Sequence, residues 1–158
     1  MANDLSSLLT GGLVVEPQTA ASRKQVLGIL STALGKRLKI DGRDILEAVL
    51  ERESLGSTAV GEGVVVPHAR VNGLERPVGG FLKLTEGVDF DAPDGATCDL
   101  IFMLLAPHVS GADHLRALAQ VSRAFRSEDL REKLRATNDT GEMFRILCPQ
   151  ADMTVDAA

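Results

Sequence analysis

The chain contains no tryptophan and no tyrosine, and phenylalanine occurs only five times. Proteins that bind single-stranded nucleic acid commonly stack its bases on aromatic side chains, so this scarcity argues against that class. The net charge of −5 argues in the same direction, because binding to nucleic acid needs a basic face. With 44% hydrophobic residues but so few aromatic ones, we expect a core built mainly from aliphatic side chains.

Cysteine is scarce as well, and long apolar runs are absent. Cys98 and Cys148 lie far apart and match neither a CxxC motif nor a zinc-ligand spacing, so we expect two unpaired thiols in a reducing compartment. No run reaches about 18 apolar residues, which argues against membrane insertion. The N-terminal segment lacks a basic region, and Asp4 interrupts it, which argues against a signal peptide. We therefore predict a cytoplasmic protein.

The length and composition fit one globular domain. A chain of 158 residues, 25% of them charged, can bury a core of its own and does not have the composition of a disordered protein. We expect a single domain over residues 1–148, followed by a flexible, polar C-terminal tail over residues 149–158. We find neither an internal repeat nor a linker.

Hydrophobic periodicity and turn residues predict strands mixed with helices. We expect helices at about 23–38, from a cap at Asp41 to about 53, from a capping box at Ser110 and Asp113 to about 125, from a cap at Ser127 to 134, and at 140–147. We expect strands at 14–15, 64–66, 78–84 and 98–105, and a polar loop at 86–95. The run at 98–105 is the most apolar, which favours a central strand buried on both faces. This order implies an α/β fold, a three-layer sandwich with a mixed β-sheet covered by helices on both faces.

The residues around Pro67 include several side chains of the kinds used in catalysis and anion binding. The β-branched run before this proline predicts a short strand that ends there, so His68 is expected at the mouth of a strand. An imidazole in that place has two interpretations: a loop histidine bonded to a backbone carbonyl, or a nucleophile that carries a transferred group. Arg52, Ser57 and Thr58 favour the second, because a guanidinium and two hydroxyls are suitable donors to an anion.

Two other kinds of site are disfavoured. A glycine spacing similar to that of a P-loop ends at Glu62, where a lysine is required, which argues against a nucleotide site. The three histidines, His68, His108 and His114, match no zinc-ligand spacing, so we expect no metal ion and no other cofactor. His108 follows a proline in a predicted loop, and we expect it to be a solvated surface residue.

The residues at 52–70 read Arg-Glu-Ser-Leu-Gly-Ser-Thr-Ala-Val-Gly-Glu-Gly-Val-Val-Val-Pro-His-Ala-Arg. This string resembles the active-site signature of the fructose/mannitol-type enzyme IIA domains of the bacterial phosphotransferase system, a family that includes the nitrogen-related regulatory IIA protein. The resemblance covers about residues 5–148 and implies the same three-layer α/β fold. It implies that His68 is the phosphorylated histidine, and that His114, in a His-Leu-x-x-Leu segment, is the second active-site histidine.

His114 keeps two interpretations. It lies on the apolar face of its predicted helix, where a hydrogen-bonded, half-buried histidine is an ordinary packing residue. It also lies in the first turn of that helix, where free N–H groups and the helix dipole favour an anion. A phosphoryl group on His68 would then lie between this helix start and Arg52.

The resemblance implies a phosphocarrier, that is, a phosphotransferase with a phosphohistidine protein intermediate. Its phosphoryl group would come from an HPr-like carrier or the nitrogen-branch counterpart of that carrier, with Arg52 as phosphate partner and Ser57 or Thr58 as further donors. In one role the protein is a regulator whose phosphorylation state decides which target proteins it binds. In the alternative role it passes phosphate to a fructose- or mannitol-type IIB domain for sugar uptake. The sequence does not identify the group that orients the imidazole of His68.

Overall fold

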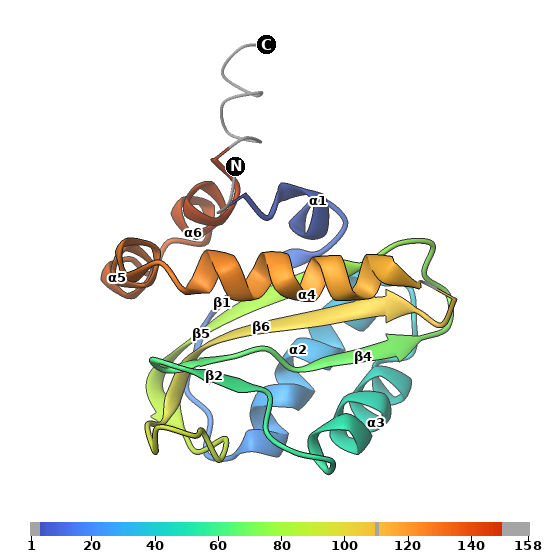
Figure 1. The fold of residues 1–158 in the computed structure, drawn as a ribbon, viewed down its shortest axis with the longest axis horizontal. Helices are drawn as coiled ribbons and strands as arrows, with labels where there is room; N and C mark the ends of the chain where they lie inside the picture. Colours follow the sequence, from blue (N-terminus) through green and yellow to red (C-terminus); the bar gives the residue numbers. More distant parts are fainter. Residues whose placement is uncertain (1–3, 110, 150–158) are drawn as a thin grey trace.

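The computed structural model describes residues 4–109 and 111–149. Six strands form one sheet, and five of them follow the order β1-β5-β6-β3-β2 (Figure 1). The sixth strand, β4, pairs with the C-terminal part of β6, on the same side of β6 as β3. The strands span Leu13–Gln18 (β1), Ala59–Gly61 (β2), Val64–Val65 (β3), His68–Val71 (β4), Val78–Val88 (β5) and Cys98–Pro107 (β6). Strands β5 and β6 are antiparallel, whereas β1 is parallel to β5, and both β3 and β4 are parallel to β6.

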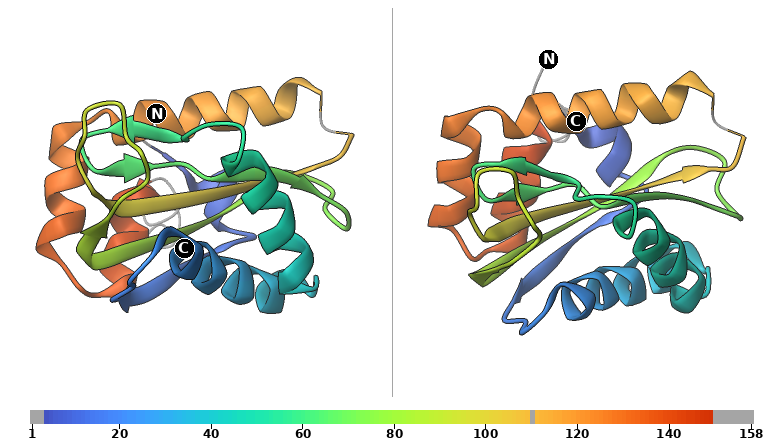
Figure 2. Two further views of the ribbon diagram at one scale, coloured as in Figure 1. Left: turned by 90° about the horizontal axis from the view of Figure 1, so that it is seen from below. Right: turned by 60° about the horizontal axis from the view of Figure 1, so that its bottom comes forward.

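Helices cover both faces of this sheet (Figures 1 and 2). One face carries α2 (Arg23–Leu38) and α3 (Gly42–Glu53), and the other carries α1 (Ser6–Leu9), α4 (Ala112–Phe125), α5 (Glu128–Ala136) and α6 (Thr140–Leu147). The predicted fold class is confirmed: a mixed sheet lies between two layers of helices.

The interior consists of two hydrophobic layers, one on each face of the sheet. The layer under α2 and α3 is almost entirely aliphatic, with Phe90 as its buried aromatic member. In the other layer Phe81, Phe102 and Phe125 pack together, and the ring centroids of Phe81 and Phe125 are 5.9 Å apart. Strand β6 contributes alternate residues to the two layers, which confirms that it is a central strand buried on both faces.

The helix starts follow the predicted caps except at α4. The side chains of Asp41 and Ser127 each accept a hydrogen bond from a backbone N–H in the first turn that follows, as predicted. The N-cap of α4 is Gly111, which has a φ of 52° and makes no side-chain cap bond. Asp113 of the predicted capping box pairs instead with an arginine of its own helix. Ser110, the other member of that box, lies outside the described residues.

Around His68 the strands differ from the prediction. The β-branched run forms only the two-residue strand β3, and the following residues form a further strand, β4, that begins at His68. A turn joins β2 to β3, and its residues Gly61, Glu62 and Gly63 all have positive φ angles. Strands of two to four residues are too short to show a periodicity, which is why the sequence placed His68 outside a strand. Strand β5 also continues to Val88, into the predicted polar loop.

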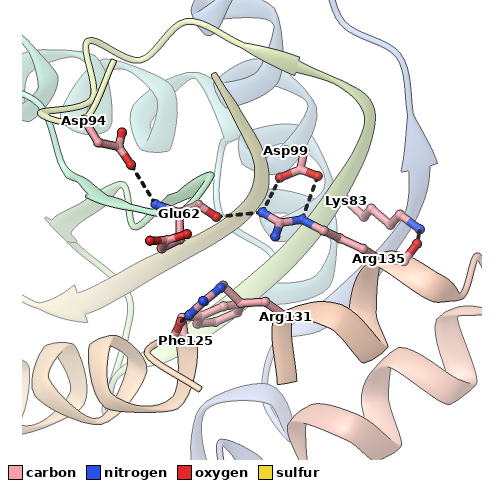
Figure 3. A network of polar contacts seen from close by, with 7 residues as sticks. All are labelled: Glu62, Lys83, Asp94, Asp99, Phe125, Arg131 and Arg135. Atoms are coloured by element: carbon pink, nitrogen blue, oxygen red, sulfur yellow. Dashed lines mark hydrogen bonds and ion pairs between the residues drawn. The ribbon is translucent and has the colours of Figure 1, made fainter. Parts of the chain in front are cut away.

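A polar network holds the β2–β3 turn (Figure 3). The N–H of Glu62 donates to Asp94 Oδ2 at 3.0 Å, and the carbonyl of Glu62 accepts from Arg135 Nη2 at 2.7 Å. Arg135, in α5, also donates to both carboxylate oxygens of Asp99 in β6, at 3.0 and 2.8 Å. A non-glycine residue with a φ of 59° is unusual, and these bonds explain why the conformation persists. The network therefore ties α5 to the segment that leads to His68.

Lys83 is buried, although lysine is rarely found in the interior of a protein. Its ammonium donates to the backbone oxygens of Arg135 and Thr137 at 2.8 and 2.7 Å, and to Asn138 Oδ1 at 3.1 Å. Burial lowers the pKa of Lys83, and the negative charge of Asp99 opposes that effect. Because all three N–H donors have acceptors, Lys83 fixes the connection between α5 and α6 to the sheet.

Several other predictions concern the cysteines and the chain ends. Cys98 and Cys148 are both unpaired and buried, as expected. Burial raises the pKa of the Cys98 thiol to about 11 and that of Cys148 to about 12, so neither is a reactive thiolate near pH 7. Within residues 4–109 and 111–149, no helix is long and apolar enough to cross a membrane. Apart from Pro149, the predicted tail at 149–158 lies outside the described residues, and the domain boundary at 148 stays a prediction.

Candidate active site

Helix α3 runs beside β4 at one edge of the sheet (Figure 1). A cavity of about 650 Å³ lies between residues of these two elements. Its lining comes from α3, β4, the loop after β6 and the first turn of α4. Three of the predicted site residues, Arg52, His68 and His114, line this cavity, although they are far apart in the sequence. The fold therefore brings together the three residues that carry the strongest chemistry of the predicted site.

His68 is the first residue of β4 and lies opposite Leu104 of β6. Its Nδ1 atom is 2.8 Å from the backbone oxygen of Val66. A carbonyl oxygen can only accept, so Nδ1 carries the hydrogen and Nε2 carries the free lone pair. Burial lowers the pKa of His68 and the positive charge of Arg52 lowers it further, while the Val66 hydrogen bond and the charge of Glu53 oppose them. The ring is therefore neutral and nucleophilic at pH 7.

His114 is the third residue of α4 and faces His68 across the cavity. The two ring centroids are 5.7 Å apart, and the ring planes make an angle of 74°. The Nε2 atom of His114 is buried, and no described residue forms a hydrogen bond with it. Burial lowers the pKa of His114, and the nearby titratable ring of His68 and the positive charge of Arg70 lower it further. A buried ring nitrogen without a protein partner beside a nucleophilic histidine is suited to bind a group that arrives with the substrate.

Arg52 supplies a cation at the end of α3. Its Nη1 atom donates to the backbone oxygen of Gly56 at 3.1 Å, which closes the loop after the helix. A guanidinium has five N–H donors in a fixed fork, so this single bond leaves donors for an anion. Arg52 lines the cavity, and its charge acts on the ring of His68.

The hydroxyls of Ser57 and Thr58 are bonded elsewhere. Ser57 Oγ donates to the backbone oxygen of Phe90 at 2.6 Å and accepts from the N–H of Ala59 at 3.1 Å. Thr58 Oγ1 donates to Oε1 of Glu53 in the interior. Neither residue belongs to the lining of the cavity. The structure thus gathers Arg52, His68 and His114 in one pocket but directs these two hydroxyls to other partners.

Arg70 and His108 are among the lining residues that the sequence analysis did not assign to the site. Arg70 follows His68 by two residues on β4, and its Nη1 atom donates to the backbone oxygen of His108 at 3.1 Å. His108, predicted as a surface residue, is indeed exposed but also lines the cavity. Side chains two residues apart on a strand share a face, so a strand starting at His68 would have placed Arg70 beside it. The sequence analysis missed Arg70 because it did not predict strand β4.

The cavity also has acidic and apolar lining. Asp44, Glu47 and Glu51, on one face of α3, contribute three acidic side chains to it. Leu55 lines the cavity with 80% of its surface exposed, and two more apolar side chains are exposed next to its histidines, Val109 at 96% and Leu115 at 70%. Within the described residues, no group of three His, Cys, Asp or Glu side chains is arranged to hold a metal ion.

Comparison with known proteins supplies the family. A family model described as "Phosphoenolpyruvate-dependent sugar phosphotransferase system, EIIA 2" matches residues 7–148. A nitrogen regulatory protein from Bradyrhizobium diazoefficiens is 42% identical over 126 residues, which cover 80% of this chain and 82% of that protein. The fructose-specific EIIA component from Haloferax volcanii is 36% identical, over 83% of this chain and 86% of that protein. The crystal structure of nitrogen regulatory protein IIA-Ntr from Neisseria meningitidis is similar, with a TM-score of 0.79 and 32% identity, over 88% of this chain and 99% of that one.

Proposed function

This chain belongs to the EIIA type-2 family of the phosphoenolpyruvate-dependent sugar phosphotransferase system, and from that premise we propose that His68 accepts a phosphoryl group from an HPr-like phosphocarrier. The family match and the nitrogen regulatory relatives support a phosphocarrier with a regulatory role. The observation that carries the assignment of His68 is its 2.8 Å hydrogen bond from Nδ1 to Val66. This bond leaves Nε2 of a cavity-lining imidazole with the lone pair that a nucleophile needs.

The transfer is an in-line displacement between two imidazole rings. The Nε2 lone pair of His68 forms a new N–P bond while the N–P bond to the carrier breaks, and the carrier ring keeps the electron pair of that bond. The hydrogen on Nδ1 of His68 stays on that nitrogen and remains hydrogen-bonded to the backbone oxygen of Val66. The protein contributes mainly the positioning of His68 and the stabilisation of the transferred charge.

The phosphoryl group adds about −1.5 to −2 charges, by analogy with other phosphorylated side chains. Because the chain already carries a net charge of −5, local donors have to compensate for this addition. We assign Arg52 to the phosphoryl oxygens, since its guanidinium can donate to two of them at once. We assign Nε2 of His114 as a further donor, because it is buried without a partner among the described residues. Ser57 and Thr58 as additional donors stay a prediction, because each hydroxyl would first have to leave its present acceptor.

A protein partner fits the surroundings of the pocket. Leu55, Val109 and Leu115 expose apolar surface around the histidines, which supports docking of a folded carrier whose own reactive side chain enters the cavity. We place the protein in the cytoplasm, and the two unpaired cysteines fit a reducing compartment of that kind.

Two roles follow phosphorylation, and the relatives favour one of them. The nitrogen regulatory relatives favour a regulator whose phosphorylation state selects its target proteins. The fructose-specific EIIA relative supports the alternative role, in which the phosphoryl group passes on to a fructose- or mannitol-type IIB domain for sugar uptake.

Phosphorylation in a reconstituted system tests the proposal. The protein is incubated with phosphoenolpyruvate, an enzyme I-type protein and an HPr-like carrier, and its intact mass is measured for wild type and His68→Ala. We expect one phosphoryl group on the wild type and none on the variant, which should fold normally because His68 is only half-buried. Acid-labile phosphate on His68→Ala would remove His68 from its assigned role. Addition of a IIB domain then separates the roles, because only the sugar-uptake role predicts rapid loss of the phosphoryl group to it.

A further inference from the structure

Glu53 is a buried carboxylate that the phosphoryl transfer described above does not use. It is the last residue of α3 and is only 8% exposed. Its Oε1 atom accepts a hydrogen bond from Thr58 Oγ1, but no described residue donates to its buried Oε2 atom. Burial of a carboxylate is unfavourable when only one of its two oxygens accepts a hydrogen bond. The C-terminal end of a helix is also an unfavourable place for negative charge. A residue that destabilises the fold in two ways needs a compensating contribution elsewhere.

A chain of three hydrogen bonds connects this carboxylate to the reactive ring. Thr58 donates to Glu53 through its hydroxyl, and its backbone oxygen accepts from the N–H of Val66 at 3.1 Å. The backbone oxygen of Val66 then accepts from Nδ1 of His68 at 2.8 Å. Thr58, which is 7% exposed, therefore joins the end of α3 to the residue that orients the imidazole.

Val66 is restrained from both sides. Pro67 follows it and favours an extended backbone at Val66, while the Thr58 bond fixes its N–H. With Val66 fixed, its carbonyl oxygen stays within hydrogen-bond distance of Nδ1 of His68, and this contact favours the ring form with hydrogen on Nδ1. Loss of the Thr58 hydroxyl removes the bond that anchors Thr58 to α3, but it leaves Pro67 and the backbone bond between Thr58 and Val66 in place.

We propose that Glu53 and Thr58 are positioning residues that hold Val66 and thereby keep His68 in the tautomer with hydrogen on Nδ1. The tautomer claim concerns the unphosphorylated protein and stands without the proposed function, whereas its effect on transfer rests on that function. This role differs from the predicted one for Thr58, a direct donor to phosphate. A phosphate donor would alter the transfer rate but not the tautomer of the resting protein.

Nitrogen NMR of the unphosphorylated protein measures the tautomer directly. Protein labelled with ¹⁵N-histidine is compared for wild type, Thr58→Val and Thr58→Ser, since valine removes the hydroxyl at equal size and serine restores it. We expect wild type and Thr58→Ser to hold the Nδ1–H form. In Thr58→Val the ratio of Nε2–H to Nδ1–H should rise about fivefold, the factor set by one hydrogen bond of ordinary net strength. Thr85→Val is the matched control, because it removes the same hydroxyl from an exposed pair with Thr19.

Variants of Glu53 separate the role of the acceptor from that of the charge. Glu53→Gln keeps an oxygen that can accept from Thr58, and we expect it to keep the wild-type tautomer ratio. Glu53→Leu removes the acceptor and should shift the ratio as Thr58→Val does. The double variant Thr58→Val/Glu53→Leu should shift it no further, because both changes break the same bond. If Glu53→Leu does not fold, the comparison of Thr58→Val with Thr58→Ser still decides the proposal.

Transfer kinetics provide the second measurement. Histidines that bind a metal ion provide an analogy, because the loss of a residue that orients such a histidine typically lowers activity by about 10- to 100-fold. For Thr58→Val we expect the rate of phosphoryl transfer to fall by an amount near the lower end of that range. An unchanged tautomer ratio in folded Thr58→Val overturns the proposal, and an unchanged ratio with slow transfer would make Thr58 a phosphate donor instead. If wild type accepts no phosphoryl group while the tautomer ratio shifts as expected, the proposed function fails and the positioning role stands.

Discussion

Replacement of Arg52 tests whether this arginine binds phosphate or only donates a hydrogen bond to the loop after α3. In the unphosphorylated protein Arg52 makes one exposed hydrogen bond, to the backbone oxygen of Gly56, and lies in the last turn of α3, where a cation is favourable. Contacts of this kind contribute about 0–1 kcal/mol to the free energy of unfolding. In a chain of this size, that loss corresponds to a fall in Tm of at most about 4 °C.

The kinetic effect should be much larger than the effect on stability. Removal of one preorganised donor to a developing charge typically lowers a rate by about 10²- to 10³-fold, so Arg52→Ala should transfer phosphate that much more slowly. Arg52→Lys keeps the charge but loses the fork that binds two oxygens, so its rate should lie between those of Ala and wild type. The assay is the initial rate of phosphorylation from the carrier, measured beside Tm for each variant.

A matched arginine on the same helix completes the design. Arg43 lies in the first turn of α3, is exposed, and pairs with Asp41 at 3.4 Å, outside the lining of the active-site cavity. Arg43→Ala should leave the transfer rate at the wild-type value. Equal rates for wild type, Arg52→Lys and Arg52→Ala would refute the assignment, as would a large loss of Tm without a kinetic effect.

Three further predictions follow from the same geometry. His114→Ala should still bind the carrier but slow the transfer or shorten the lifetime of phosphohistidine by about 10²- to 10³-fold; wild-type values for both would make it a packing histidine. Burial lowers the pKa of His68 and His114 in the folded state, so the unfolded chain binds more protons as the pH falls through 6.5, and stability should fall with it. Urea midpoints at about pH 7.5 and pH 5.5 test this, and the double variant His68→Ala/His114→Ala should have a flatter pH dependence. Lys83→Met should lower the free energy of unfolding by about 2 kcal/mol or more, because it leaves buried oxygens without a donor; an unchanged urea midpoint would contradict that.

The sequence was informative wherever a local pattern determines a local structure. Caps at Asp41 and Ser127 were predictable because a short polar side chain directly before a helix can accept a hydrogen bond from a free backbone N–H of the first turn. The buried central strand was predictable from an unbroken apolar run. The meeting of Arg52, His68 and His114 was predictable only through the ordered motif and its family resemblance, because no periodicity relates three segments that lie far apart in the chain.

The sequence was uninformative wherever a long-range partner determines the role of a side chain. Ser57 and Thr58 have the composition of a phosphate loop, but their hydroxyls find acceptors in Phe90 and Glu53, one of them far along the chain. A lysine near the end of a strand is usually exposed, but three oxygens from the end of α5 and its connection to α6 accept hydrogen bonds from Lys83 and make its burial tolerable. Arg70 was missed because β4 is too short to recognise as a strand.

The central claim is that Nε2 of His68 carries the phosphoryl group. A ³¹P–¹⁵N correlation spectrum of the phosphorylated protein, labelled with ¹⁵N-histidine, identifies both the residue and the ring nitrogen that is bonded to phosphorus. Because Nδ1 is held by the oxygen of Val66 at 2.8 Å, we predict a single coupling, to Nε2 of His68, with the hydrogen retained on Nδ1. A coupling to Nδ1 of His68, or to either nitrogen of His108 or His114, would contradict the account.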